Sequence, residues 1–361
     1  MKGRTIMLIR DSIAGMSGYV PGEQPRDKRY VKLNTNENPY PPSAKVEDAL
    51  RGVDAGRLRL YPDPVCTELR EVAGELLGVG PEWVLCGNGS DDLLTIAVRT
   101  AVDQGGFLAC PDPSYSLYPV LANIQGAACV TVPLDEKFEL PDDFLERTEG
   151  ASLLFLARPN APTGNAFVKA DVERICGAFP GIVWIDEAYV DFADDHCAEL
   201  VRRFDNVVVS RTLSKSYSLA AIRLGWAYAN PALISEMMKV KDSYNVNMLT
   251  QVLATAALRD TSTMRVQAER IRTTRAWVSA ELVELGFEVL PSAANFVFAA
   301  PPCPAADVFK ALRDRGVLVR YFSQPRIDRY LRVTIGTDEE MAVFVAAVKD
   351  ILSHAGGASD S

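Results

Sequence analysis

The stretch "RTLSKSYSLAAIRLGW" (residues 211–226) sets a single amine, Lys215, among small and hydroxyl-bearing side chains. It follows an apolar run, residues 207–209, of the kind that forms a buried strand. A second cation, Arg223, comes eight positions after the lysine. Positive charge nearby favours a lysine that reacts as a free amine, and hydroxyls beside an arginine suit a phosphate group. The stretch therefore predicts a reactive lysine next to a bound phosphate, just beyond the end of a strand.

Short apolar runs alternate with longer helical patterns on both sides of this stretch. The predicted strands are residues 83–86, 106–110, 128–134, 152–157, 181–186, 206–210 and 225–230. Apolar strands separated by helices indicate an α/β protein, with a mostly parallel sheet that is covered on both faces.

After about residue 245 the pattern changes to a long amphipathic helix, residues 263–286, followed by short strands and helices. We predict an N-terminal arm (1–40) that joins the small domain, a large cofactor-binding α/β domain (41–245) and a small C-terminal α+β domain (246–361).

Composition narrows the class of protein. The chain has 361 residues, which is long enough for two subdomains, and its net charge of −9 argues against nucleic acid as a partner. Its seven cysteines include no C-x-x-C pair, and this favours reduced thiols in the cytoplasm. The chain has only two histidines, and this argues against a histidine-ligated metal site and against a Ser-His-Asp triad. No apolar run reaches the length of about 18 residues that a membrane span needs, so we expect no membrane partner.

Polar residues follow several predicted strands, at the edge where ligands of open α/β sheets bind. Asp186 ends one strand and Lys215 lies beyond another. Three more strand ends lead into "GNGSDD" (87–92), "PDPSYSLY" (111–118) and "RPNAPTG" (158–164). Pyridoxal phosphate uses an amine for its aldehyde, an acid at its ring nitrogen, a phosphate cradle at a helix N-terminus, an aromatic ring on its face and an amide near its hydroxyl. We therefore expect this cofactor and no metal.

The chain resembles the histidinol-phosphate aminotransferase family, whose members are class II aminotransferases of fold type I. The matching motifs, in order, are "GYVPG" (18–22), "LNTNENPYPPS" (33–43), "YPDP" (61–64), "GNGSDD", "PDPSYSLY", "PNAPTG" (159–164), "DEAYVDF" (186–192), "RTLSKSYSLAAIRLGW", "KDSYNVN" (241–247), "NFVF" (295–298) and "LRVTIGT" (331–337). The resemblance implies the fold of a type I pyridoxal-phosphate-dependent transferase.

By position, the resemblance implies a set of residues around the cofactor. Lys215 would form the Schiff base and act as general base, Asp186 would pair with the ring nitrogen, and Tyr189 would hydrogen-bond the ring hydroxyl. The other cofactor-binding residues would be Tyr115 on the ring face, Ser90 and Asp91 through their backbone amides, and Thr212, Ser214 and Arg223 on the phosphate. Tyr61 would reach the phosphate from a neighbouring subunit, which implies a homodimer with shared active sites.

The resemblance also implies a substrate site for a small amino donor and a 2-oxo acid. Arg332 would clamp the substrate α-carboxylate. Arg320 would bind the substrate phosphate with help from Tyr19, and Asn36 would lie close to the substrate carboxylate.

One position departs from the family pattern. The family usually has Asn-Asn-Pro-Thr-Gly, and the residue before the proline bonds the ring hydroxyl. Here that residue is Ala161, and the nearest amide is Asn160. Either the loop shifts so that Asn160 reaches the cofactor, or Tyr189 acts alone. Losing one donor would raise the pH at which the Schiff base titrates, and a spectroscopic titration of Asn160→Ala would decide between these alternatives.

The reaction implied is the reversible, ping-pong transfer of an amino group between L-histidinol phosphate and 2-oxoglutarate, giving imidazole-acetol phosphate and glutamate in histidine biosynthesis. An aromatic amino acid aminotransferase and a threonine-phosphate decarboxylase stay open as relatives with the same cofactor. A transcription regulator with an aminotransferase-like domain would need an added basic segment, which this acidic chain lacks. A dinucleotide-dependent oxidoreductase would need a glycine fingerprint after a strand, and "GNGSDD" is not one.

Overall fold

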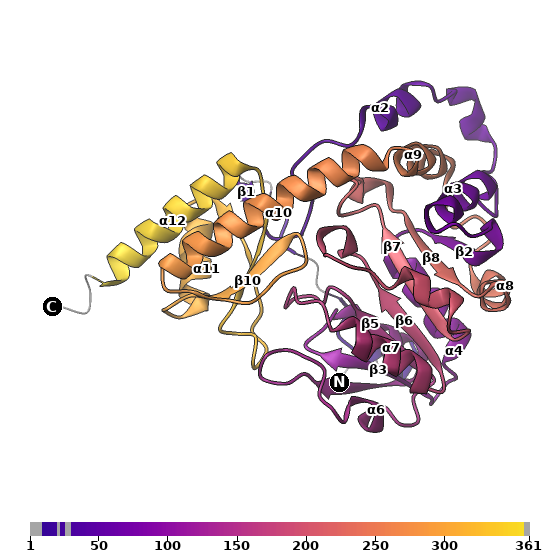
Figure 1. Ribbon diagram of the computed structural model, residues 1–361, viewed down its shortest axis with the longest axis horizontal. Helices are drawn as coiled ribbons and strands as arrows, with labels where there is room; N and C mark the ends of the chain where they lie inside the picture. Colours follow the sequence, from indigo (N-terminus) through magenta and orange to yellow (C-terminus); the bar gives the residue numbers. More distant parts are fainter. Residues whose placement is uncertain (1–8, 20–21, 26–29, 357–361) are drawn as a thin grey trace, which may run out of the picture.

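A computed structural model describes residues 9–19, 22–25 and 30–356 of the chain. Val20 and Pro21 of the "GYVPG" motif, and residues 1–8 and 26–29 of the predicted arm, lie outside the described residues. Two parts lie side by side in Figure 1, a larger one built on a seven-stranded sheet and a smaller one built on a four-stranded sheet. The predicted α/β fold class is confirmed, whereas the three domain boundaries stay a prediction.

The seven-stranded sheet has the order β2-β8-β7-β6-β5-β3-β4. Its strands are β2 (Val84–Gly87), β3 (Phe107–Asp112), β4 (Ala128–Pro133), β5 (Leu153–Ala157), β6 (Ile182–Asp186), β7 (Val207–Thr212) and β8 (Gly225–Ala229). Only β8 runs antiparallel to its neighbours, and the other pairs are parallel. All seven agree with the predicted strands to within two residues at each end.

Both faces of this sheet are buried because side chains alternate across it. Leu153, Phe155 and Trp184 point into one cluster with the helices α4 (Ser90–Ala101) and α5 (Leu117–Gln125), while Leu154 and Ile185 point into a second cluster. The helices of this part are α2 (Ala44–Arg51), α3 (Thr67–Leu77), α4 (Ser90–Ala101), α5 (Leu117–Gln125), α6 (Phe144–Arg147), α7 (Lys169–Ala178), α8 (Pro231–Val240) and α9 (Met248–Leu258).

The smaller part holds an antiparallel sheet of order β12-β13-β10-β9. Its elements are α10 (Thr261–Glu284), β9 (Glu288–Val289), β10 (Phe296–Ala300), α11 (Ala305–Asp314), β11 (Val317–Leu318), β12 (Arg320–Tyr321), β13 (Leu331–Thr334) and α12 (Asp338–Gly356). The N-terminal segment contributes α1 (Asp11–Ala14) and β1 (Val31–Lys32), and β1 pairs in parallel with β11. This pairing brings the segment that follows β1, residues 33–38, next to the smaller part.

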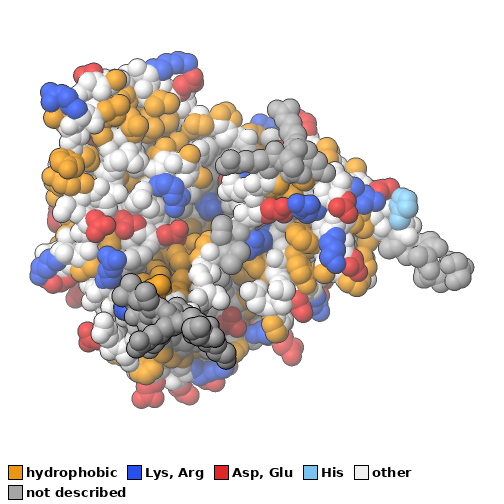
Figure 2. All heavy atoms as spheres, turned by 180° about the vertical axis from the view of Figure 1, so that it is seen from behind, with side chains coloured by type: hydrophobic (Ala, Val, Ile, Leu, Met, Phe, Trp, Pro, Cys, Tyr) orange, Lys and Arg blue, Asp and Glu red, His pale blue; other side chains and the backbone are white. Residues whose placement is uncertain are grey.

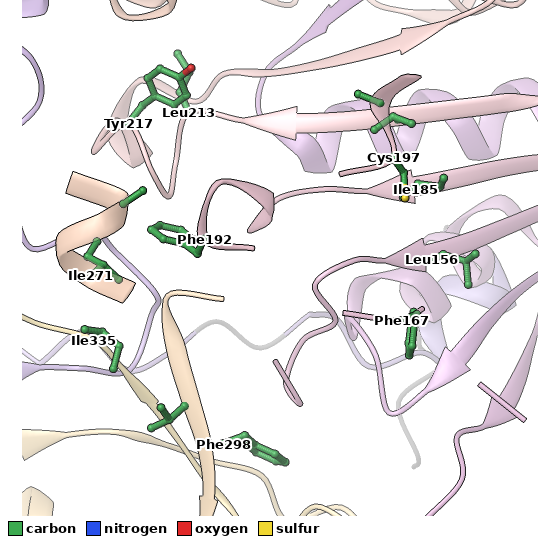
Figure 3. Packing of buried hydrophobic residues seen from close by; sticks show 14 of the residues in the cluster. Leu156, Phe167, Ile185, Phe192, Cys197, Leu213, Tyr217, Ile271, Phe298 and Ile335 are labelled. Atoms are coloured by element: carbon green, nitrogen blue, oxygen red, sulfur yellow. The ribbon is translucent and has the colours of Figure 1, made fainter. Parts of the chain in front are cut away.

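The long helix α10 connects the two parts (Figure 1). At its start, the Asp260 carboxylate accepts hydrogen bonds from the hydroxyls of Ser43, Ser262 and Thr263 at 2.6–2.8 Å. Farther along, the helix packs against β9, β10 and α12. One hydrophobic cluster runs through both parts, and Figure 3 follows it from Ile185 through Phe192 to Phe298. Within the described ranges, no helix combines the length and the apolar character that a membrane span requires.

Candidate active site

The carboxyl ends of β6 and β7 bring the predicted catalytic acid and lysine to one edge of the large sheet. Asp186 is the last residue of β6 and pairs in register with Ser210 of β7. Lys215 follows β7 by three residues. Parallel strands end at the same edge, so the order of the sheet accounts for this meeting of residues that are 29 positions apart.

The Asp186 carboxylate is buried and held by neutral donors. Tyr118 Oη donates to Oδ2 at 3.2 Å, and the Ala188 amide donates to Oδ1 at 3.2 Å. Ser210 Oγ lies 3.5 Å from Oδ1 and itself accepts from Trp184 Nε1 at 2.9 Å. Burial raises the pKa of Asp186 to about 6, although the Tyr118 hydroxyl acts in the opposite direction. A buried acid of this kind is suited to face a cationic group of a ligand.

Lys215 lies against the segment that follows β1 and against Tyr189. Its Nζ donates to the Thr35 carbonyl at 3.4 Å and lies 5.6 Å from the centre of the Tyr189 ring. The Tyr189 hydroxyl accepts from Asn36 Nδ2 at 2.9 Å. The structure thus groups the lysine, the phenol predicted to bind a ring hydroxyl, and a residue predicted to contact substrate.

A cradle for an anion forms where the turn before α4 meets Arg223. Gly89 has a positive φ of 83°, and a Cβ there would come within 2.5 Å of Arg223 Nη2. Gly225 likewise allows the turn before α4 to approach closely, since a Cβ at this position would lie 2.8 Å from the Ser90 amide. Gly89 gives α4 no side-chain cap, and the buried Ser90 Oγ has no hydrogen-bond partner among the residues that the structure describes. Free amides at a helix start, an unpartnered hydroxyl and a guanidinium are the groups that bind phosphate.

The other residues predicted for the phosphate lie around this cradle. Arg223 Nη1 lies 3.4 Å from Ser214 Oγ, and Ser214 Oγ lies 3.0 Å from Thr212 Oγ1. The Tyr115 hydroxyl donates to Asp91 Oδ1 at 3.0 Å. Burial, followed by the charge of Asp91, raises the pKa of Tyr115. The aromatic ring is therefore tied to the first turn of α4.

The two predicted substrate arginines face each other across β12 and β13. Arg320 and Arg332 are register partners. The Arg332 guanidinium lies 5.4 Å from the Phe296 ring and 5.5 Å from the Phe322 ring. Its Nε is buried, and within the described part of the chain it has no hydrogen-bond partner. Burial, together with the charge of Arg320, lowers the pKa of Arg332. A half-buried arginine with a buried, unused donor is suited to bind an anion.

Two other tyrosines predicted for the site lie on its outside. Tyr19 is 44% exposed and packs edge-on against Tyr115, with ring centres 6.0 Å apart. Tyr61 is 82% exposed and stacks on Tyr244 at 4.6 Å. Among the described residues, no recorded contact joins Tyr61 to the cradle of its own chain.

Asn160 lies fully buried within the "RPNAPTG" loop. Its Nδ2 donates to the Pro113 carbonyl at 2.9 Å and to Thr163 Oγ1 at 2.8 Å, and its Oδ1 accepts from Ser114 Oγ at 2.8 Å. Both amide hydrogens are thus taken up inside the loop.

Sequence reasoning missed three features of the site. Tyr118 belongs to the quoted "PDPSYSLY" motif, but the sequence indicates a role only for Tyr115 of this motif and not for the Tyr118 hydroxyl at Asp186. The Asp92 carboxylate shapes the cradle by accepting from the Asn88 amide at 2.8 Å and from Asn245 Nδ2 at 2.9 Å. The "KDSYNVN" motif containing Asn245 was the signal that could have pointed to this contact. The third is the bond between Asn36 and Tyr189, which no local pattern indicates.

No cluster of three or more potential metal ligands occurs in the part of the chain that the structure describes. The functional groups that the site brings together are an amine, a buried acid, an anion cradle and two arginines.

Known proteins with similar sequences and folds agree on the class of this site. The family model of class I and II aminotransferases matches residues 28–348. A histidinol-phosphate aminotransferase of a Synechocystis species is 48% identical over 349 residues, covering 96% of this chain and 99% of that protein. One from Citrifermentans bemidjiense is 45% identical over 348 residues, with coverage of 96% and 99%.

Solved structures show the same architecture. The histidinol-phosphate aminotransferase of Sinorhizobium meliloti, in complex with pyridoxal-5'-phosphate, has a TM-score of 0.88 at 25% identity and covers 97% of this chain and 99% of that one. The L-threonine-O-3-phosphate decarboxylase of Porphyromonas gingivalis has a TM-score of 0.79 at 20% identity, with coverage of 89% and 99%, which is a likeness of fold alone.

The fold, and the family model that spans it, define the protein as a class I and II aminotransferase of fold type I. With relatives 45–48% identical over nearly its whole length, the chain belongs to the histidinol-phosphate aminotransferase family.

Proposed function

We propose that the protein transfers an amino group reversibly between L-histidinol phosphate and 2-oxoglutarate, with pyridoxal phosphate as its cofactor. Membership in the histidinol-phosphate aminotransferase family supports the reaction. The observation that carries the choice of substrates is the pair of arginines at the site, Arg320 and Arg332. The buried Nε of Arg332 is a donor that no group of the described residues uses.

The residues of the cradle fit the phosphate of this cofactor. The amides of Ser90 and Asp91, the unpartnered Ser90 hydroxyl, Ser214 and Arg223 would hold it, with Thr212 behind Ser214. Any side chain at Gly89 would displace the Arg223 guanidinium, so the glycine supports the same reading. Tyr115 would lie on the ring, and Asp186 would meet the ring nitrogen.

Pyridoxal phosphate, when bound, supplies an aldehyde that takes up the amino group and a protonated ring that withdraws electrons from the substrate carbon. Lys215 would carry the cofactor on Nζ, and the same atom would move the proton that leaves the substrate carbon. The ionised carboxylate of Asp186 would keep the proton on the ring nitrogen, because Tyr118 and the Ala188 amide donate to it. Tyr189 would donate to the ring hydroxyl.

The arginines would distinguish the two amino donors, glutamate and histidinol phosphate, by their anionic groups. Glutamate has two carboxylates, which would use Arg332 and Arg320 together. Histidinol phosphate has no α-carboxylate, so its phosphate must be bound separately, and Arg320 with Tyr19 would do this.

We propose further that two copies of the chain share their sites, with Tyr61 reaching the phosphate of the other copy. Support comes from exposed apolar side chains on α2, on α9, which packs against α2, and in the segment between α2 and α3 that holds Tyr61. They are Leu50, Leu249, Leu58, Leu60 and Val65. Hydrophobic side chains gather on the corner of the molecule in Figure 2 that corresponds to α2 and the turns after it. The seven cysteines all carry free thiols, which supports a reducing compartment such as the cytoplasm.

The decisive experiment is a visible spectrum of the purified protein with pyridoxal phosphate, before and after L-histidinol phosphate is added without an acceptor. We expect conversion of the bound cofactor to its pyridoxamine form, and recovery of the original spectrum with 2-oxoglutarate. Lys215→Ala is the control, since it should give neither the coloured adduct nor the cycle.

Three results would contradict the proposal. They are a wild-type protein that takes up no cofactor, release of carbon dioxide from threonine phosphate without an oxo acid, and phenylalanine acting as a far better amino donor than histidinol phosphate.

A further inference from the structure

This chain lacks the side-chain amide that, in the family pattern, stands before the proline of "PNAPTG" and donates a hydrogen bond to the ring hydroxyl of the cofactor. Position 161 is alanine, which has no polar side chain, and both amide hydrogens of Asn160 are engaged by Pro113 and Thr163. Tyr189 is then the side chain left to donate there. What controls the direction of its single O–H is therefore an important feature of the site.

Asn36 controls the Tyr189 hydroxyl from the opposite side. Its Nδ2 donates to Tyr189 Oη at 2.9 Å, so one lone pair of the phenol is occupied by an N–H. An oxygen that accepts from Asn36 cannot donate back along the same line, so its own hydrogen points elsewhere. Lys215 Nζ lies against the Tyr189 ring, on the side where the cofactor would be attached.

Asn36 is itself fixed on every polar group. Its backbone amide donates to Thr334 Oγ1 at 2.9 Å, and the same hydroxyl donates to Asn36 Oδ1 at 3.0 Å. Its carbonyl accepts from Asn295 Nδ2 at 3.0 Å. The residue is 1% exposed and has a φ of 56°, a left-handed conformation that asparagine tolerates better than most residues. Such complete fixation orients the amide nitrogen toward Tyr189.

We infer that Asn36 is a positioning residue that holds Tyr189 as the hydrogen-bond donor to the ring hydroxyl, in place of the amide lost at Ala161. This inference rests on the proposed function. It differs from the expected role of Asn36 at the substrate carboxylate, because it acts in the absence of substrate. Through the bonds between Asn36 and Thr334, the position of Tyr189 also depends on β13, the strand that carries Arg332.

The test is a pH titration of the visible absorption of the substrate-free protein loaded with pyridoxal phosphate. The charged and titratable groups that act on Tyr189 or lie against it are Lys215, Arg332 and Tyr115, and all of them stay in place. Asn36→Gly removes the donor without strain at the positive φ, and Asn36→Asp keeps the shape but turns the donor into an acceptor. Asn36→Gly should move the midpoint to higher pH by about half a unit to one unit, the size of one lost hydrogen bond. Asn36→Asp should move it further in the same direction, because its negative charge also favours the protonated form of the chromophore.

Two controls separate this role from a general loosening of the segment. Asn34→Ala changes a buried asparagine of the same segment that bonds the Glu23 carbonyl, and it should leave the midpoint unchanged. In a Tyr189→Phe background, which already has a raised midpoint, Asn36→Gly should add no further shift.

Unshifted midpoints in both Asn36 variants would overturn the inference, and so would an equal shift with Tyr189→Phe present. A wild-type protein that never becomes coloured would instead overturn the proposed function, and this inference with it. A coloured wild type with unshifted variants overturns the inference alone.

Discussion

The hydroxyl of Tyr118 lies 3.2 Å from Oδ2 of Asp186, and both residues are buried beneath the edge of the large sheet. The Tyr118 ring stacks on Phe155 at 4.5 Å, which fixes the direction of the hydroxyl. A neutral donor inside the protein therefore stabilises the charged form of the acid that would face the ring nitrogen.

Replacing Tyr118 by phenylalanine keeps the ring and its packing but removes this donor. We expect a higher pKa of Asp186 and cofactor binding weakened by about tenfold, the effect of losing a hydrogen bond to a charged group. Equilibrium titration with pyridoxal phosphate measures the affinity. Tyr228→Phe is the matched control, since its hydroxyl donates to the Ala73 carbonyl at 2.7 Å. Equal losses in both variants would contradict a specific role of Tyr118.

The free energy of unfolding of the cofactor-free protein should fall as the pH rises through the pKa of Asp186. The pKa of this group is about 6 when folded, against an ordinary value of 3.8, because burial disfavours the charge. Between these values the folded state binds more protons, so the free energy of unfolding falls with rising pH. From about pH 5 to about pH 7 the loss should be about 1 kcal/mol. Urea unfolding of the wild type and Asp186→Asn at both pH values checks this. Parallel pH profiles of the two proteins would refute it.

Gly89 and Gly105 offer a matched pair for the phosphate cradle. Both have positive φ, 83° and 77°, but a Cβ at Gly89 would press on Arg223 while one at Gly105 would meet no atom within 4 Å. Alanine should cost about 1–2 kcal/mol of stability from backbone strain at Gly105, and about 1–3 kcal/mol at Gly89, whose ψ of 171° suits glycine almost exclusively. Only Gly89→Ala should weaken pyridoxal phosphate binding, by tenfold or more. Binding of pyridoxal, which has no phosphate, should change little in both. A cofactor affinity that fell equally in the two variants would argue against the cradle.

Arg320→Ala should separate the two kinds of amino donor. We expect kcat/KM for histidinol phosphate to fall by about a hundredfold, since a charge-assisted contact of about 2–3 kcal/mol is lost. A neutral amino acid such as phenylalanine should lose far less. Arg315→Ala, which removes an exposed ion pair with Asp350, serves as the control for loss of a charge in the smaller part of the molecule. Equal decreases for both donors would remove Arg320 from the phosphate.

Much of the fold could be predicted because its strands are apolar on both sides and alternate with helices. The lysine and acid could be placed at one edge because parallel strands share a direction. The pairing of β1 with β11 was not predicted, since two residues are too few to show a period. The bonds of Asn36 to Tyr189 and of Tyr118 to Asp186 join residues 153 and 68 positions apart, and only packing of the complete chain selects them.

The start of α10 has a mechanical consequence. A helix of 24 residues is about 36 Å long and resists bending, and its first turn is secured through the three hydroxyls on Asp260. If the sheet bearing Arg332 moves when substrate binds, α10 must rotate with it as a rigid body about the contacts of Asp260. Weakening the Ser43 contact would then alter how the two parts of the molecule move relative to each other, without changing any group predicted to meet the substrate.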